Sequence, residues 1–347
     1  MVENITLDFG FCNVKTTNDF LLVWVQTCIY SLLIELPLAL LVFKYYYVDI
    51  TYEKWVYKIQ PYKFPSLKQI QTELVSLAPK SIVVYGTIQV ISLYLASNGY
   101  SKGYCFSNNQ QQEYPSYYAL VLQPMLIYVL LDLMLWCQHT LGHVKVSGLW
   151  KYHRVHHVES DVINPISAFA DHWFDTVTQK GPALILLPFI IPISMEVYVF
   201  VLVVFANFHG IMFHSGYEST ILTSHNGIFA TAYHHHIHHK MSHVNKSYYN
   251  GFLLFWDYLA GTYLPKDKCQ CITCRRSNNK NNQMPLRTRE EFDALVIPDY
   301  MGLFSFNGVV IPIFSRLSIK TKRRSLHRSI ATSYTMTTKH HVGEASS

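Results

Sequence analysis

Charged residues are scarce in this chain. Asp, Glu, Lys and Arg make up 14% of its 347 residues, against about 25% in a typical globular protein. Half of the residues are apolar. No internal repeat and no glycine-rich phosphate-binding motif is visible, which argues against a nucleotide site of its own. The net charge of +6 is better explained by basic loops beside a membrane than by nucleic acid as a partner. This composition predicts a protein of the lipid bilayer.

Long apolar stretches support this interpretation. They occupy residues 20–43, 81–97, 117–137 and 182–214, and each is about long enough to cross a bilayer as a helix. The first is too long for a removable signal peptide. The last could cross once or fold as a hairpin, which Pro188 and Pro192 favour. We therefore expect an all-α, multi-pass membrane protein with about four or five membrane helices, including a hairpin.

Lysine positions predict the orientation. The loop between the first two stretches carries six lysines and the next loop only Lys102, so the first loop should be cytosolic. The N-terminus would then be luminal, with Asn4 as a possible glycan acceptor. Everything just after residue 137 would lie in the cytosol.

The seven cysteines are an odd number and give no clear pairing by spacing. Cys28 and Cys137 lie in apolar stretches and are expected to be packing residues. Cys269, Cys271 and Cys274 form a CxCxxC motif in a polar, basic loop. Zinc binding, palmitoylation and plain solvated thiols all stay open for this motif.

Histidines are concentrated in one region: fifteen of eighteen lie between residues 139 and 243. His139 and His143 are four apart, so both rings project from one face of a helix. The pattern His-x-x-His-His then occurs twice, at 153–157 and 235–239. A lone interfacial histidine such as His225 is more often an ordinary surface residue. Three closely spaced groups of histidines together, however, indicate a metal site.

The number of histidines bears on the kind of metal site. Eight or more exceed the four ligands of one tetrahedral ion, which predicts two metals. Imidazole suits iron, zinc, copper and nickel alike, so spacing does not choose among them. A metal centre directly beneath membrane helices could receive a lipid from the bilayer. Because iron with O2 can attack an unactivated C–H bond and zinc cannot, oxidation of a lipid is the first interpretation.

The ordered motifs HTLGH, HRVHH and HHHIHH, with a hydrophobic hairpin between the second and third, resemble those of the fatty acid hydroxylase and sterol desaturase superfamily. The resemblance covers about residues 117–265. AFADHWFD and NFHGIMFHSGYE are most similar to sterol C5-desaturases (lathosterol oxidases). HSGY also resembles sterol C4-methyl oxidases and cholesterol 25-hydroxylases. The chain departs from the C5-desaturase pattern at Asp175-Thr176 and at Ser215, which affects the substrate more than the metal centre.

The resemblance implies a set of iron ligands. They are His139, His143, His153, His156, His157, His235, His238 and His239, with His172 and His214 as additions. A cytosolic His214 requires 182–214 to be a hairpin. Further residues could orient the ligands from behind: Asp132, His209, His234 and Asp257, with Asp171 and Asp175 as weaker candidates for the same role.

The resemblance also implies a cofactor and partners: two Fe ions, O2 as co-substrate, and electrons from NAD(P)H through cytochrome b5 and its reductase. It implies the endoplasmic reticulum membrane, with the active site in a helical, histidine-rich di-metal cap facing the cytosol. We expect an N-terminal membrane region (1–116), a catalytic domain (117–265) and a polar, basic linker and tail (266–347). The favoured activity is sterol C5-desaturation. The alternatives are sterol C4-methyl oxidation, cholesterol 25-hydroxylation, fatty acyl or sphingolipid hydroxylation, and a non-catalytic zinc-binding membrane protein.

Overall fold

The computed structural model describes residues 14–105, 118–159, 162–241, 249–263, 269–279 and 287–304. Within these ranges the chain forms helices and no strand, apart from three isolated β-bridges. The predicted all-α fold is thus confirmed. The chain forms two compact units, 1–298 and 299–347. The described part of the second unit contains one short 3₁₀ helix, η9 (Met301–Phe304).

The first candidate membrane span runs from Thr17 to Val48. It joins α1 (Thr17–Tyr30), the π-helical η1 (Ser31–Glu35), α2 (Leu36–Phe43) and η2 (Lys44–Val48). Thr16 caps it: its hydroxyl accepts from the Asp19 backbone N–H, and the Asp19 carboxylate accepts from the Thr16 backbone. Large apolar side chains such as Leu22 and Leu33 are exposed along it, as expected of a helix that faces lipid.

The second candidate span, Leu67–Ser97, follows the short α3 (Tyr52–Trp55). It comprises α4 (Leu67–Thr72), η3 (Glu73–Leu77) and α5 (Ala78–Ser97). Glu73 is fully buried in it. The Glu73 carboxylate accepts hydrogen bonds from the Asn164 amide at 2.9 Å and the Ser167 hydroxyl at 2.9 Å. This polar contact fixes the loop after the second histidine motif against the membrane helix.

The third candidate span is α6 (Gln123–His143), which η4 (Tyr118–Leu122) precedes. It ends at the HTLGH motif. The short η5 (Lys145–Ser147) then leads to α7 (Trp150–Glu159), which carries HRVHH, and to η6 (Pro165–Phe169). The first two histidine motifs therefore lie on consecutive helices.

The stretch 182–214 lies in a helical hairpin. Its first arm, α8 (Trp173–Ile190), begins before the apolar stretch and contains Pro182 and Pro188 in its interior. The chain turns at 191–194, where Ser194 caps α9 (Met195–Phe200), and returns through η7 (Val201–Asn207) and α10 (Phe208–Phe213). The returning arm, Met195–Phe213, is the fourth candidate span. The hairpin that Pro188 and Pro192 favoured is confirmed.

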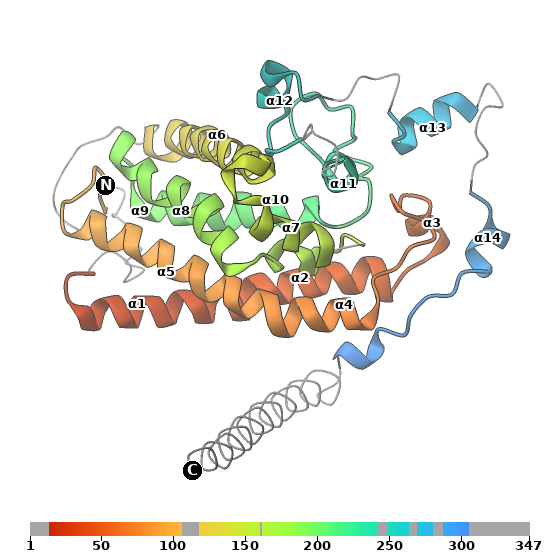
Figure 1. Cartoon of the computed structure of the whole chain (residues 1–347), viewed down its shortest axis with the longest axis horizontal. Coiled ribbons are helices and arrows are strands. Elements are labelled where there is room, and N and C mark those ends of the chain that lie inside the picture. Colours follow the sequence, from red (N-terminus) through yellow and green to blue (C-terminus); the bar gives the residue numbers. More distant parts are fainter. Residues whose placement is uncertain are drawn as a thin grey trace, which may run out of the picture. The chain divides into compact units, whose positions relative to one another are not determined.

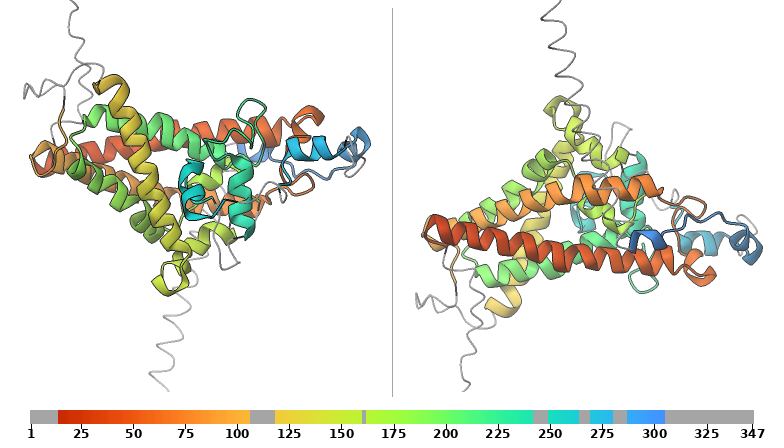
Figure 2. Two further views of the ribbon diagram at one scale, coloured as in Figure 1. Left: turned by 90° about the horizontal axis from the view of Figure 1, so that it is seen from above. Right: turned by 90° about the horizontal axis from the view of Figure 1, so that it is seen from below.

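These long helices pack side by side. α1 contacts α5, and α8 contacts both α5 and α6; Figure 1 shows α1 lying along α5, and Figure 2 shows the same pair from two further sides. Val23, Val90, Leu131, Leu184 and Tyr198 contribute to one buried core between them. Burying this apolar surface holds the bundle together at its centre.

A second, smaller core surrounds α11 (Ala232–Met241), which carries the third histidine motif. Phe213, Tyr249 and Leu254 pack there, and Cys271 joins them. α12 (Leu254–Ala260), α13 (Ile272–Asn279) and α14 (Arg289–Asp293) follow in the chain. α13 lies within the segment 266–347 that was expected to be a polar, basic linker and tail. Cys271, directly before this helix, packs in the smaller core.

Candidate metal centre

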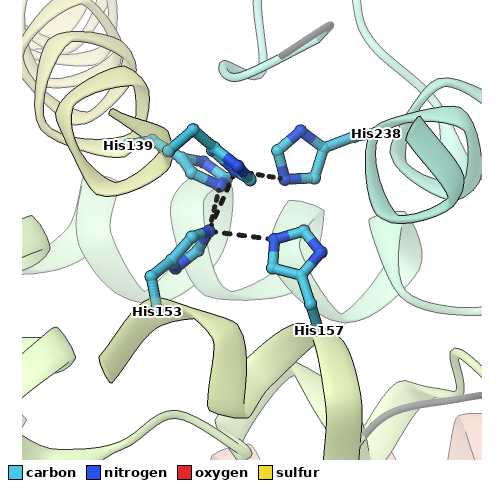
Figure 3. A group of neighbouring side chains, drawn as sticks. His139, His153, His157 and His238 are labelled. Carbon is cyan, nitrogen blue, oxygen red and sulfur yellow. Dashed lines mark hydrogen bonds between the residues drawn. The ribbon is translucent and has the colours of Figure 1, made fainter. Parts of the chain in front are cut away.

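One cluster of histidines brings together three helices. Its ligand atoms all lie within 4.8 Å of one another, and its members are His139 and His143 of α6, His153 and His157 of α7, and His238 of α11. The Nε2 atom of His153 lies 3.1 Å from that of His139, 3.0 Å from that of His143 and 2.9 Å from that of His157. Figure 3 shows the rings pointing toward one another from their different helices.

A second cluster lies beside the first. It contains His156 of α7, His214 at the end of α10, and His235 and His239 of α11. The His214 Nε2 atom is 2.8 Å from that of His235 and 3.4 Å from that of His156. All four side chains are buried.

The repeated His-x-x-His-His pattern explains why there are two clusters. Neighbouring residues on a helix point about 100° apart, since a turn holds 3.6 residues. His156 and His157 therefore enter different clusters, and so do His238 and His239. α7 and α11 each supply ligand atoms to both clusters, which fixes the two groups next to each other.

The nitrogen spacing fits a bound metal ion. With metal–nitrogen bonds of about 2.0–2.1 Å, neighbouring ligand nitrogens are about 3 Å apart, as the Nε2 atoms of both clusters are. The Nδ1 atoms, on the other side of the imidazole rings, also agree with metal binding through Nε2. His139 Nδ1 lies 2.9 Å from the Asn250 carbonyl oxygen and His214 Nδ1 lies 2.7 Å from that of Gly210. An Nδ1–H that donates to a carbonyl leaves the Nε2 lone pair free to face the cluster.

Burial keeps these imidazoles uncharged. It lowers the pKa of His153 and His156 to about 4 and that of His214 to about 3, with neighbouring imidazoles adding to the effect for His156 and His214. The pKa values of His157, His235 and His239 are also well below the usual value, first because of burial. A neutral imidazole is the form that binds metal.

Two buried carboxylates orient the second histidine motif. Asp175 Oδ2 lies 3.0 Å from His153 Nδ1, and Asp171 Oδ1 lies 3.3 Å from His156 Nδ1. Lys180 pairs with Asp171 at 2.7 Å. Burial alone would raise the pKa of Asp171, but Lys180 and His156 outweigh it and hold this pKa at about 2. Burial and the charge of Asp171 raise the pKa of Asp175 to about 6.

Asp132 and Asp257 hold a loop beside the first cluster. Asp132 accepts hydrogen bonds from the backbone N–H groups of Phe252 (2.7 Å) and Leu253 (2.9 Å) and from the Trp256 indole. Asp257 accepts from the backbone N–H of Tyr249 at 3.0 Å. Both carboxylates thereby hold the loop whose Asn250 carbonyl faces His139.

Three predicted histidines lie outside both clusters. His172 caps α8, because its Nδ1 accepts from the Phe174 backbone N–H at 3.1 Å. His209 bonds the Tyr128 hydroxyl through Nδ1 and the Ala230 carbonyl through Nε2. His234 Nδ1 accepts from the Thr231 backbone N–H at 3.0 Å, at the start of α11. The position of His172 therefore does not support its expected role as a ligand.

Some contacts at the site carried no signal in the sequence. The Gln179 amide lies 2.6 Å from His153 Nδ1 and 2.8 Å from Asp175 Oδ1. It is one turn after Asp175 on α8, a spacing that is visible only once the helix is known. Asn250 contributes a backbone carbonyl, so its side-chain type gives no clue at all.

Both clusters open onto one cavity of about 160 Å³. His139 and His153 of the first cluster line it, as do His156, His214 and His235 of the second. Apolar side chains of the membrane helices form much of the remaining wall: Ile82, Leu131, Leu135, Leu184, Leu202 and Phe213. The cavity thus places an apolar wall beside the metal-ligating histidines.

Comparison with known protein families bears on this site. Residues 124–262 match the family model described as fatty acid hydroxylase. The match contains all nine clustered histidines and supports the superfamily that the motifs resemble. A fatty acid hydroxylase family implies an oxidoreductase, and together with the four candidate spans it indicates a membrane-bound hydroxylase or desaturase. No curated protein and no solved structure matches the chain.

Proposed function

We propose that the protein is a membrane-bound di-iron oxidase that uses O2 to desaturate or hydroxylate a lipid. The observation that carries this proposal is the shared cavity. Two adjacent all-histidine clusters form one part of its wall, and side chains of the candidate membrane helices form much of the rest. A lipid entering between the helices would meet both clusters at once.

The chain's own residues have distinct roles in this proposal. The nine histidines hold the ions through Nε2, while Asp171 and Asp175 fix the rings of His156 and His153. Two iron ions bound there would supply the O2 activation needed to break an unactivated C–H bond. The apolar wall binds the hydrocarbon and excludes water from it. The product is an alcohol, or a double bond when a second hydrogen is lost.

A sterol is the proposed substrate, and its C5–C6 bond the proposed position. The support is the similarity of AFADHWFD and NFHGIMFHSGYE to the sterol C5-desaturases. A polar pair in the cavity wall is consistent with this: Glu35 accepts a hydrogen bond from the Asn207 amide, and both line the cavity. Glu35 is buried within the first candidate span. Such a pair would anchor the single hydroxyl of a lipid whose remaining surface is apolar.

We further propose that the site faces the cytosol from the endoplasmic reticulum membrane and receives electrons from NAD(P)H through cytochrome b5 and its reductase. The lysine-rich loop between the first two spans supports this orientation. Cys105, in the loop predicted to be luminal, is disulfide-bonded, and disulfides form in oxidising compartments.

The test is lipid profiling by mass spectrometry after expression in a host that lacks sterol C5-desaturase. The wild-type chain should restore the C5-unsaturated sterol. His156→Ala removes a ligand of the second cluster and should abolish the product. His236→Ala, on α11 but outside both clusters, is the matched control and should retain it.

Other outcomes separate the alternatives. A new hydroxylated lipid without restored desaturation would replace the C5-desaturase proposal by hydroxylase or C4-methyl oxidase activity. If the His156→Ala variant oxidised the lipid as fully as the wild type does, the assignment of the histidine clusters as the active site would be wrong. Zinc in both clusters without any new lipid product would favour a non-catalytic zinc-binding protein.

A further inference from the structure

A third group of metal-ligating side chains lies outside the two histidine clusters. It consists of His225, in the loop before α11, and Cys269, Cys271 and Cys274 of the CxCxxC motif. His225 Nε2 lies 3.1 Å from the sulfur of Cys271, 3.1 Å from that of Cys274 and 3.7 Å from that of Cys269. All four ligand atoms lie within 4.8 Å of one another, and none of the three cysteines forms a disulfide.

We propose that these four residues bind one structural zinc ion. A tetrahedral zinc with Zn–S bonds of about 2.3 Å and a Zn–N bond of about 2.0–2.1 Å places nitrogen and sulfur about 3.6 Å apart. The observed separations lie close to this value. Three cysteines and one histidine complete the four ligands of a closed structural site, which leaves no position for a substrate.

The surroundings of the sulfur atoms agree with a zinc site. The Cys274 backbone N–H points at the Cys271 sulfur, 3.5 Å away, as expected where a backbone amide stabilises a metal-bound thiolate. Cys271 is fully buried and packs in the core around α11. The Cys271 sulfur is therefore inaccessible to an acyl chain and is not a solvated thiol, whereas Cys269 and Cys274 are half-buried.

The zinc site would join two segments that are more than forty residues apart. Around it, the Glu218 carboxylate accepts from the Ile272 backbone N–H at 2.8 Å, and the Tyr233 hydroxyl accepts from that of Gln270 at 2.6 Å. Tyr233 belongs to α11, two residues before the ligand His235. Zinc therefore fixes the cysteine loop against the helix that carries the third histidine motif.

The test is the zinc content of the purified full-length protein in detergent. Wild type should retain one zinc ion per chain after dialysis against a weak chelator. Cys274→Ser and His225→Ala should lose it, whereas His225→Cys supplies a fourth thiolate and should keep it. Cys137→Ser, an exposed free cysteine in α6, is the matched control and should also keep it.

Cobalt substitution gives a second measurement that does not depend on whether a variant folds. Cobalt-loaded wild type should show thiolate-to-cobalt charge-transfer absorption, which the histidine clusters cannot produce. Absence of this band in wild type, zinc content unchanged in Cys274→Ser, or a fatty acyl group on any of the three cysteines would overturn the proposal. His156→Ala should keep the thiolate-bound ion, which separates this inference from the proposed oxidase activity.

Discussion

At the scale of single residues, the hydrogen bonds behind the ligands distinguish one histidine from another. His153 has a carboxylate behind its ring, His139 has a backbone carbonyl, and His172 uses its ring nitrogen to cap a helix. Identical side chains thus perform different tasks according to what their second nitrogen contacts. Substitutions behind the rings should therefore affect metal binding selectively.

Asp175→Asn should weaken metal binding in the first cluster. An amide accepts a weaker hydrogen bond than a carboxylate and does not stabilise the imidazole ring of His153 as well. Loss of such a supporting carboxylate typically lowers metal affinity about 10- to 100-fold. The measurement is a chelator competition titration of the iron in the purified protein, with lipid product formed per chain as the second readout.

His172→Ala is the control for that variant, because His172 begins the same helix three residues earlier but contacts neither cluster. Its loss should cost only the cap of α8, about 0.5–2 kcal/mol of stability, and leave the iron affinity unchanged. Iron loss in His172→Ala equal to that in Asp175→Asn would restore His172 as a ligand.

Sequence patterns indicated the histidines that cluster better than the residues that support them. The spacing of His153, His156 and His157 is readable because one helix carries all three. His225 gave no such signal, since its three cysteine neighbours lie more than forty residues away in the chain. Asp171 and Asp175 were only weaker candidates for orienting a ligand, because no local spacing places them beside His156 and His153 of α7. Contacts made by folding, and not by local spacing, account for what was missed.

At the scale of helices and loops, α6 does more than supply His139 and His143. Through Asp132 it holds the loop at 250–253, where Gly251 lies so close that an added Cβ would be 3.1 Å from the Asp132 carboxylate. In this arrangement Asp132 positions the loop whose Asn250 carbonyl faces His139.

Asp132→Asn should destabilise the fold while retaining the metal ligands. The carboxylate accepts from three N–H groups, and an amide leaves at least one of these buried donors unsatisfied, at a cost of about 1–3 kcal/mol. Thermal unfolding in detergent measures this. Asp293→Asn, in an exposed pair with Arg289, should change stability by under about 1 kcal/mol; an equal shift in both variants would contradict this role.

Helix boundaries show where composition is a poor guide. The apolar stretches predicted the spans, but α8 begins at Trp173, well before the apolar residues start, because His172 caps it there. The basic segment after 271 lacks apolar periodicity, yet α13 forms in it where Cys271 is buried. Local caps and tertiary burial set these ends, and a hydropathy profile contains neither.

At the scale of the whole molecule, hydropathy and histidine spacing were enough to predict a helical membrane protein with a histidine-rich metal site. They did not predict that both clusters would share one cavity. That arrangement depends on α10 bringing His214, and α11 bringing His235, to the far side of α7. It also needs the hairpin at 182–214, which the prolines favoured and the structure contains.

The central claim is that nine histidines in two clusters hold two iron ions. X-ray absorption at the iron edge, combined with iron quantification on the purified full-length protein, tests it most directly. We predict two iron ions per chain, coordinated by nitrogen and oxygen without sulfur. Iron bound through sulfur, or an iron-free protein that still oxidises lipid, would contradict the account.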